Sequence, residues 1–175
     1  ITDSVEKRLR NDRRAVIIYG PRQSGKTTLS KIIIERLGWK TLMVNADEGR
    51  YAEILSSRSR AKLRDFVGSN ELLFIDEAQR IPEIGLNLKI MIDDEALKHV
   101  HFLVTGSSAL DLASSVAEPL TGRNWSYHLF PIAINELSST NSHFELQQMI
   151  EQRLLYGSYP FIFHLKSSED KWQYL

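Results

Sequence analysis

The stretch GPRQSGKT at positions 20–27 constrains this chain more than any other feature of its sequence. Its two glycines stand five positions apart, and a lysine and a hydroxyl residue follow the second one. The spacing matches G-x-x-x-x-G-K-[ST], the Walker A or P-loop pattern, in which a glycine-rich loop between a strand and a helix binds phosphates. The motif therefore requires a buried strand before the loop and a helix after it.

Both flanking elements can be read from the sequence. Residues 15–20 (AVIIYG) form a short apolar, β-branched run that ends at glycine, which predicts a buried strand. Residues 27–37 carry apolar side chains at helical spacing, and Gly38 is placed to end that helix. The required context of the motif is therefore present.

The rest of the chain alternates between apolar runs and helical patterns. Strands are predicted at 41–46, 71–77 and 100–106, with a weaker one at 127–130; helices are predicted at 5–10 (capped by Asp3 or Ser4), 51–66, 84–97 and 144–156. This alternation indicates an α/β fold whose mostly parallel sheet is covered by helices on both faces. Right-handed crossovers place all the strand C-termini along one edge, where such folds bind ligands.

Composition excludes several other kinds of protein. The 175 residues suit one domain with a small appendage, and 22 basic against 22 acidic residues give no general argument for nucleic acid or acidic membranes. Cysteine is absent, the five histidines lack metal-ligand spacing, and no apolar run reaches the roughly 18 residues of a membrane span. We expect a cytoplasmic protein without a membrane partner. The chain has no initiator Met, so we expect it to be a trimmed piece.

Each part of the loop has a predicted role. Gly20 and Gly25 permit a tight backbone path whose N–H groups point at phosphate oxygens, and the following helix adds its positive end. Lys26 can reach the β- and γ-phosphates, and the Thr27 hydroxyl suits Mg²⁺. The predicted cofactors are ATP or ADP with Mg²⁺, and the predicted nucleotide-binding residues are Gly20, Pro21, Arg22, Gln23, Ser24, Gly25, Lys26, Thr27 and Thr28.

The stretch LLFIDEAQ at positions 72–79 supplies the second half of the site. An apolar strand that ends in an acid, the Walker B pattern, suits a carboxylate that holds Mg²⁺, so we assign this role to Asp76 and expect it to share one ion with Thr27. Glu77 can polarise an attacking water as a general base. Two solvated acids at a strand end are the plainer interpretation, which the neighbouring P-loop disfavours.

Two further positions have open interpretations. Thr105 or Ser107, at the end of a predicted strand, can orient the water near the γ-phosphate, or Ser107 or Ser108 can simply cap the next helix. Arg123 precedes the last predicted strand, and we expect it near the sheet edge that carries the loop. It can stabilise charge on the transferring phosphoryl group, within one chain or across a subunit contact. From spacing alone, a surface salt bridge is favoured for it.

A basic cluster invites a nucleic-acid interpretation. Its members are Arg58, Arg60, Lys62 and Arg64. At helical spacing these side chains spread around more than one face, so a solvated helix is the favoured interpretation.

Five segments, in order, carry a resemblance to a known family: IIYGPRQSGKTTL, LFIDEAQRIPEIGLNLKIMID, FLVTGSSALDL, LTGRNWSYHLFPIAINEL and LLYGSYPFIF. Together they resemble the bacterial and archaeal AAA+-type ATPases that carry a C-terminal domain of unknown function. The resemblance runs from about Ser4 to Phe163. The TGSSAL, TGR and GSYP pieces are more specific to this group than the phosphate loop or the acidic strand.

The resemblance implies a P-loop NTPase fold, a three-layer αβα sandwich with a five-stranded sheet in the order 5-1-4-3-2. It also implies nucleotide at the 20–27 loop, Asp76 and Glu77 as the metal-binding and water-activating acids, and Arg123 as a functional arginine. Family members continue well past GSYP. We therefore expect an ATPase core at 1–140, and at 141–175 a helical segment that leads to a C-terminal region missing from this sequence.

These observations favour an enzyme that hydrolyses ATP with Mg²⁺ and couples hydrolysis to a conformational change. The main alternative is a nucleotide-gated switch with negligible turnover. A small-molecule kinase would need a second substrate pocket and a lid of arginines, and a GTPase would need an [NT]-K-x-D motif, which does not occur. We expect self-association through Arg123. The sequence does not identify a protein or nucleic-acid partner.

Overall fold

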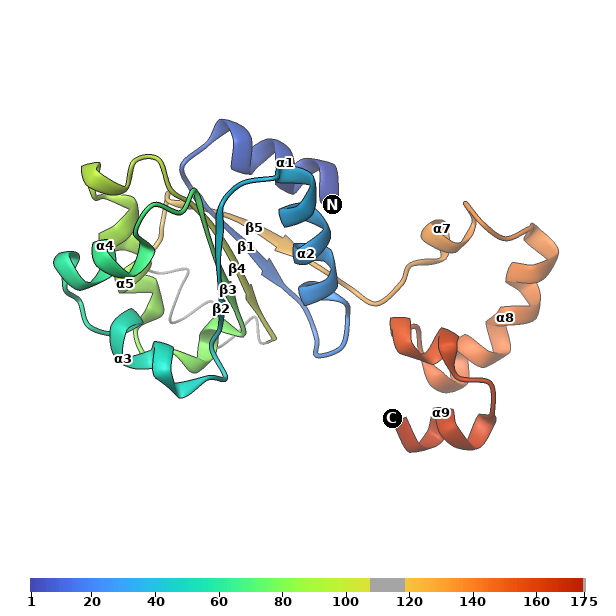
Figure 1. Ribbon diagram of the computed structural model, residues 1–175. Coiled ribbons are helices and arrows are strands. Elements are labelled where there is room, and N and C mark those ends of the chain that lie inside the picture. Colours follow the sequence, from blue (N-terminus) through green and yellow to red (C-terminus); the bar gives the residue numbers. More distant parts are fainter. Residues whose placement is uncertain (108–118, 175) are drawn as a thin grey trace. The chain divides into compact units, whose positions relative to one another are not determined.

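The computed structural model describes residues 1–107 and 119–174 (Figure 1). Their contacts divide the chain into two compact units, one of residues 1–20 and 26–128, the other of residues 21–25 and 129–175. The predicted cap Ser108 lies outside the described residues. We expected the boundary between the ATPase core and the helical segment after residue 140. In the structure, the longer segment of the second unit begins at residue 129.

The first unit is built on a five-stranded parallel sheet. Its strands are β1 (Ala15–Tyr19), β2 (Thr41–Asn45), β3 (Leu72–Asp76), β4 (His101–Gly106) and β5 (Asn124–His128). They lie in the order β2-β3-β4-β1-β5, and every neighbouring pair is parallel. Read from the other edge, this is the order 5-1-4-3-2 that the family resemblance implied, so that prediction is confirmed.

Helices cover both faces of this sheet. They are α1 (Thr2–Asn11), α2 (Lys26–Leu37), α3 (Ala52–Leu55), α4 (Arg60–Val67) and α5 (Ile84–Ile92), with short 3₁₀ turns η1 (Gly49–Tyr51), η2 (Ala78–Arg80) and η3 (Glu95–Leu97). In Figure 1, α1 and α2 lie on one face, and α3, α4 and α5 on the other. The predicted three-layer α/β architecture is therefore present.

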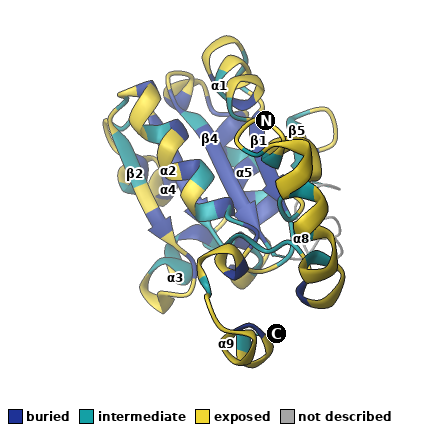
Figure 2. Ribbon diagram, turned by 90° about the vertical axis from the view of Figure 1, so that its right-hand side faces the viewer, coloured by how far each residue is buried: buried dark blue, intermediate teal, exposed yellow. Residues whose placement is uncertain are grey.

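The core of this unit lies along the central strands. All five residues of β1 and the first four of β3 are buried, as the continuous apolar runs predicted. Phe74 and Phe102, from adjacent strands, are among the largest fully buried side chains. Figure 2 shows the central strands in the colour of buried residues beneath more exposed helices. Burying each large apolar side chain contributes about 1.5–3 kcal/mol, so the core holds the strand ends in place.

The last strand lies three residues earlier than predicted. β5 spans Asn124–His128 rather than 127–130, and its residues are half-buried or exposed. It pairs with β1 alone, at the edge of the sheet. An edge strand faces solvent and tolerates polar side chains, so a search for apolar runs places it poorly.

Several predicted helices also differ in extent. The predicted helix 51–66 is broken into η1, α3 and α4, and Ser59 caps α4 by accepting from the backbone N–H of Lys62. The predicted helix 84–97 ends at Ile92. Helix α1 begins at Thr2, so the predicted caps, Asp3 or Ser4, lie inside the helix instead of at its start.

The second unit is helical beyond residue 128. It contains α7 (Ile134–Leu137), α8 (His143–Tyr156), the 3₁₀ helix η5 (Pro160–His164) and α9 (Ser168–Tyr174). Helix α8 begins at a capping box in which Ser142 and Glu145 satisfy each other's backbone N–H groups. Within the described helices of the whole chain, none is long and apolar enough to cross a membrane.

Candidate functional site

The phosphate loop connects β1 to α2. Lys26 is the first residue of α2 and is 4% exposed, and its Nζ donates to the backbone oxygen of Gly20 at 3.0 Å. The helix therefore begins at the lysine, with its N-terminal N–H groups and positive dipole end at the loop. This is the strand–loop–helix context that the motif requires.

The loop residues 21–25 belong to the second unit and have an unusual backbone. Gly25 has φ +96° and Gln23 has φ 62°, both in the region that side chains disfavour. A Cβ built on Gly25 would lie 3.9 Å from Pro160 Cγ, within the GSYP segment of the same unit. Ser24 is 5% exposed, and its Oγ has no hydrogen-bond partner among the described residues. That hydroxyl is suited to a ligand oxygen.

The predicted metal ligands come together in the first unit. Thr27 Oγ1 donates to Asp76 Oδ2 at 2.7 Å, although the two residues are 49 positions apart. The hydroxyl of Thr105 donates to the other carboxylate oxygen of Asp76. A hydroxyl and a carboxylate are hard oxygen donors of the kind that Mg²⁺ prefers, so these residues fit that ion.

Glu77 follows directly at the end of β3. Its backbone is left-handed, with φ 53° and ψ 42°, and its N–H donates to Thr105 Oγ1 at 3.3 Å. A non-glycine residue in this conformation is strained, and such strain clusters at functional sites. Thr105 is fully buried and bridges the side chain of Asp76 to the backbone of Glu77. The structure therefore brings together four predicted residues: Thr27, Asp76, Glu77 and Thr105.

Gln79 is a site residue that the sequence reasoning missed. Its Nε2 donates to Glu77 Oε2 at 2.5 Å and to Ser107 Oγ at 2.9 Å. The sequence feature that could have indicated Gln79 is its position two residues after the glutamate in DEAQ. Its partner Ser107, however, lies on another segment and could be paired with it only from the fold.

A cavity of about 260 Å³ adjoins this site within the first unit. Thr27 and Asp76 line it together with Lys31, Asn45, Glu48 and residues of β2 and β3. Asn45 ends β2 and is aligned with Asp76 in the sheet register. The sequence reasoning singled out neither Lys31 nor Asn45. The place of Asn45 beside Asp76 depends on the strand order.

Arg123 lies at the amino edge of the sheet, where the strands begin. The expectation that it lies at the carboxyl edge, which carries the phosphate loop, is wrong. It precedes β5, and its backbone oxygen accepts from the N–H of Ala15, the first residue of β1. Parallel strands of five residues separate the two edges by about 16 Å, which exceeds the length of an arginine side chain. Arg123 Nε instead donates to Asp93 Oδ1 at 2.8 Å.

Two of the four residues of the basic cluster form ion pairs with acids. Arg58 forms an ion pair with Glu83, and Arg64 donates to both carboxylate oxygens of Asp94 at 2.7 and 2.6 Å. Asp94 is 2% exposed, and the hydrogen bonds from Arg64 lower its pKa. These contacts agree with a structural use of the cluster.

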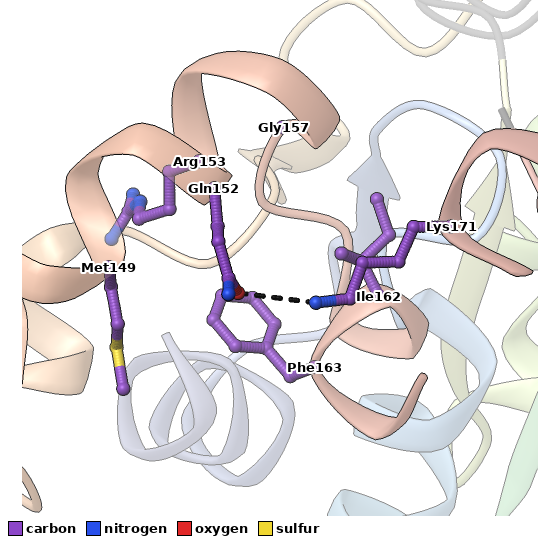
Figure 3. Close-up of a pocket in the computed structure, with 7 residues that line it drawn as sticks. All are labelled: Met149, Gln152, Arg153, Gly157, Ile162, Phe163 and Lys171. Carbon is purple, nitrogen blue, oxygen red and sulfur yellow. Dashed lines mark hydrogen bonds between the residues drawn. The ribbon is translucent and has the colours of Figure 1, made fainter. Parts of the chain in front are cut away.

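The second unit contains a smaller cavity of about 70 Å³ (Figure 3). Gln152, Arg153 and Lys171 line it beside apolar residues that include Phe163, and Lys171 Nζ donates to Gln152 Oε1 at 3.2 Å. Figure 3 shows the two cationic groups on opposite sides of Gln152. They therefore do not converge as a joint anion site.

Among the described residues, no group of three or more His, Cys, Asp or Glu side chains is arranged to hold a metal.

Comparison with protein families gives one clear match. Residues 12–138 match the sequence model of a family described as "AAA domain". The matched range covers β1 to β5 and contains every residue that contacts Asp76 or Glu77 above.

Relatives among characterised and uncharacterised proteins are longer. The uncharacterized protein Rv2008c of Mycobacterium tuberculosis is 30% identical over 157 residues, which is 89% of this chain and 32% of Rv2008c. The replication factor C large subunit of Methanosarcina mazei is 32% identical over 72 residues, 40% of this chain and 12% of that protein. This chain therefore spans about a third of Rv2008c and a smaller share of the replication factor.

Solved structures agree with the fold. A DNA replication initiation factor superimposes with a TM-score of 0.53 at 15% identity, over 89% of this chain and 59% of that one. A structure of Pif1 helicases at forked double-stranded DNA gives a TM-score of 0.50 at 17% identity, over 86% of this chain and 50% of that one. At these identities the likeness concerns the fold alone.

Proposed function

We propose, from the premise that this chain belongs to the AAA domain family, that it binds ATP with Mg²⁺ and hydrolyses it, coupling hydrolysis to a conformational change. The single observation that supports this best is the contact between Thr27 Oγ1 and Asp76 Oδ2 at 2.7 Å. It joins the start of α2 to the end of β3 beside Lys26. An ordinary glycine turn would need neither the lysine nor this pair.

In this proposal the loop residues 20–28 bind the nucleotide. Their backbone N–H groups and the N-terminus of α2 face the phosphates, and Lys26 exchanges its contact with Gly20 for the β- and γ-phosphates. Thr27 and Asp76 would hold Mg²⁺, which neutralises charge on the phosphate oxygens when bound. The unpaired, buried hydroxyl of Ser24 supports an oxygen-rich ligand at the loop.

Glu77 is the proposed general base. Its carboxylate takes a proton from a water molecule while the water oxygen attacks the γ-phosphorus, and the bond to the β-phosphate oxygen breaks to leave ADP and phosphate. Thr105 is occupied by Asp76 and by the backbone of Glu77. We therefore assign the γ-phosphate contact to Ser107 and a bracing role to Thr105.

The alternative is a nucleotide-gated switch that turns over negligibly. One observation favours it, because Glu77 Oε2 accepts a hydrogen bond from Gln79 and so is partly occupied. Measuring both binding and phosphate release separates the two functions. Binding without release identifies a switch, whereas release that is lost in Glu77→Gln identifies an ATPase.

Arg123 is proposed to act across a contact between chains. It lies at the opposite edge of the sheet from Asp76, which argues against a role within its own chain. A relative's name, replication factor C large subunit, points to an assembly, and we extend self-association to this chain by analogy. We also place this ATPase domain in a longer cytoplasmic protein with a C-terminal domain of unknown function, as the resemblance implied.

The decisive experiment is calorimetric titration of the chain with ATP, in Mg²⁺ and then in EDTA, paired with a phosphate-release assay. We expect binding that is tighter in Mg²⁺, and release that requires it. Failure of ATP to bind under either condition would overturn the proposed function. Equal affinity in both conditions would remove the assigned roles of Thr27 and Asp76.

A further inference from the structure

We infer that Gln79 is a positioning residue that holds the Glu77 carboxylate and couples it to Ser107. This inference rests on the proposed ATPase function and assigns a residue that the Walker patterns do not contain. It is carried by one side-chain amide that donates twice, to Glu77 Oε2 at 2.5 Å and to Ser107 Oγ at 2.9 Å.

Local structure brings Gln79 back toward Glu77. Directly after the left-handed Glu77, the 3₁₀ turn η2 is closed by the bond from Arg80 N to Glu77 O at 3.0 Å. This turn places a side chain two positions later beside the carboxylate. The strained backbone of Glu77 therefore belongs to the same turn that brings the Gln79 amide to the Glu77 carboxylate.

The amide also connects two strand ends. Glu77 follows β3, and Ser107 follows β4, the neighbouring strand. The backbones of these ends are already joined, because Glu77 N donates to Thr105 Oγ1. Gln79 is the residue that links the side chain of Glu77 to β4. A shift of Ser107 on contact with a γ-phosphate would therefore be transmitted to the carboxylate.

A purely structural role explains this amide less well. Its Oε1 is buried and has no hydrogen-bond partner among the described residues. A buried acceptor without a partner costs free energy, so a glutamine kept only for stability would be expected to satisfy it. Both of its donors are instead directed at the two residues assigned to water activation and phosphate contact.

The first test uses steady-state ATP hydrolysis with calorimetric MgATP binding. Gln79→Ala should lower kcat about 10- to 100-fold, because a misplaced base loses that much, while KM and MgATP affinity stay within about twofold. Gln79→Glu, of equal length but unable to donate, should lower kcat at least as far. The matched control Gln148→Ala, at an exposed position of α8, should leave kcat unchanged.

Coupling to Ser107 is tested by the double variant. Ser107→Ala also removes the proposed γ-phosphate contact, so the double variant should be slower than Gln79→Ala. Its loss in kcat should nevertheless be smaller than the product of the two single effects, because both changes remove one shared interaction. Fully multiplicative effects would overturn the coupling. An unchanged kcat in Gln79→Ala, or an equal fall in kcat and affinity, would overturn the positioning role.

A measurement that does not depend on ATP hydrolysis tests this inference independently of the proposed function. The side-chain amide resonances of Gln79, assigned in NMR spectra by their disappearance in Gln79→Glu, should shift in Glu77→Gln and again in Ser107→Ala. Shifts in both variants support the link even if the parent chain releases no phosphate, a result that would overturn the ATPase alone. Absence of both shifts overturns the link, whatever the turnover.

Discussion

Four acids beside the parallel sheet have two kinds of partner: two lie at the amino edge, where the strands begin, and two at the carboxyl edge, where the strands end. At the amino edge, Asp94 accepts two hydrogen bonds from the Arg64 guanidinium, and Arg123 is paired with Asp93. At the carboxyl edge, the carboxylate of Asp76 accepts from two threonine hydroxyls, and the carboxylate of Glu77 accepts from a side-chain amide.

This difference distinguishes acids that are paired for stability from the acids that we propose act in the site. A guanidinium both orients a carboxylate and neutralises it, and the hydrogen bonds from Arg64 accordingly lower the pKa of Asp94. Hydroxyl and amide donors orient a carboxylate but leave its charge in place. Asp76 and Glu77 therefore keep negative charge available for a cation, whereas Asp93 and Asp94 are neutralised by arginines.

The largest expected effect compares the two glutamates that flank β3. Glu77→Gln should slow ATP hydrolysis by about 10²–10⁴-fold and keep MgATP binding, because the amide cannot accept the proton of the attacking water. Glu71→Gln, at the amino end of the same strand, should leave the rate unchanged, since the Glu71 carboxylate accepts from the backbone N–H of Lys40 and lies at the opposite end of β3 from Asp76. Phosphate release by both variants checks this. Equal rates in the two variants would remove the functional distinction between the edges.

Lysines at the two edges provide the second comparison. Lys26→Ala should weaken ATP binding by at least about 100-fold, because truncating one partner of a buried charge pair typically costs 2–5 kcal/mol. Lys40→Ala removes a lysine whose Nζ contacts Ser69 at the amino edge, and it should keep full affinity. Calorimetry measures both, and circular dichroism confirms that both variants fold. Unchanged affinity in Lys26→Ala would contradict the assignment of the loop.

Asparagine substitutions of the two aspartates should affect different properties. Asp76→Asn should remove most of the Mg²⁺-dependent gain in ATP affinity, with little loss of stability. Asp94→Asn should instead lower the free energy of unfolding by about 1–3 kcal/mol, since it weakens charge-assisted bonds to Arg64. Titrations with and without Mg²⁺ and urea unfolding measure the two effects. A stability loss confined to Asp76→Asn would reverse the comparison.

The stabilising effect of Asp94 should also depend on pH. Because its pKa is lowered in the folded state, the stability that it contributes is complete above its unfolded pKa of about 3.9 and is lost as pH falls through the folded value. The gap in unfolding free energy between the parent and Asp94→Asn should therefore be constant near neutral pH and shrink below about pH 4. A gap that widens on acidification would contradict this assignment.

The smallest expected effect in a single chain is that of Arg123→Ala. Its pair with Asp93 is about 38% exposed, so the loss of stability should be below about 1 kcal/mol, and ATP affinity should not change. Mixing Arg123→Ala with Lys26→Ala chains should recover some hydrolysis, because each supplies what the other lacks. If mixing recovers nothing and Arg123→Ala keeps the parent rate at high protein concentration, the arginine is only a surface ion pair.

Residues were placed correctly from the sequence where their position depends on local spacing. Lys26 and Thr27 follow a glycine at fixed offsets, and Asp76 ends an apolar run, so each could be placed on its element without knowledge of the fold. Their meeting at 2.7 Å followed from one topological rule, that parallel strands end at a common edge. The assigned roles in binding and hydrolysis stay predictions.

Prediction was poorer where a residue's place depends on its neighbours in space. Arg123 was expected at the wrong edge, although a residue that precedes a parallel strand lies at the amino end of the sheet. Gln79 was missed because its partners Glu77 and Ser107 meet only when β3 and β4 are adjacent. A glutamine has no charge or periodicity that would single it out in a sequence.

The sequence by itself determined that a strand, a glycine-containing loop and a helix follow one another at β1 and α2, because the patterns that predict them act over a few residues. Only the tertiary structure decided which acids are neutralised and which keep their charge. Asp76 and Asp94 both follow apolar segments, yet the tertiary structure sets hydroxyls from α2 and β4 beside one and a guanidinium from α4 beside the other. That choice depends on contacts between residues that are tens of positions apart, which no local pattern records.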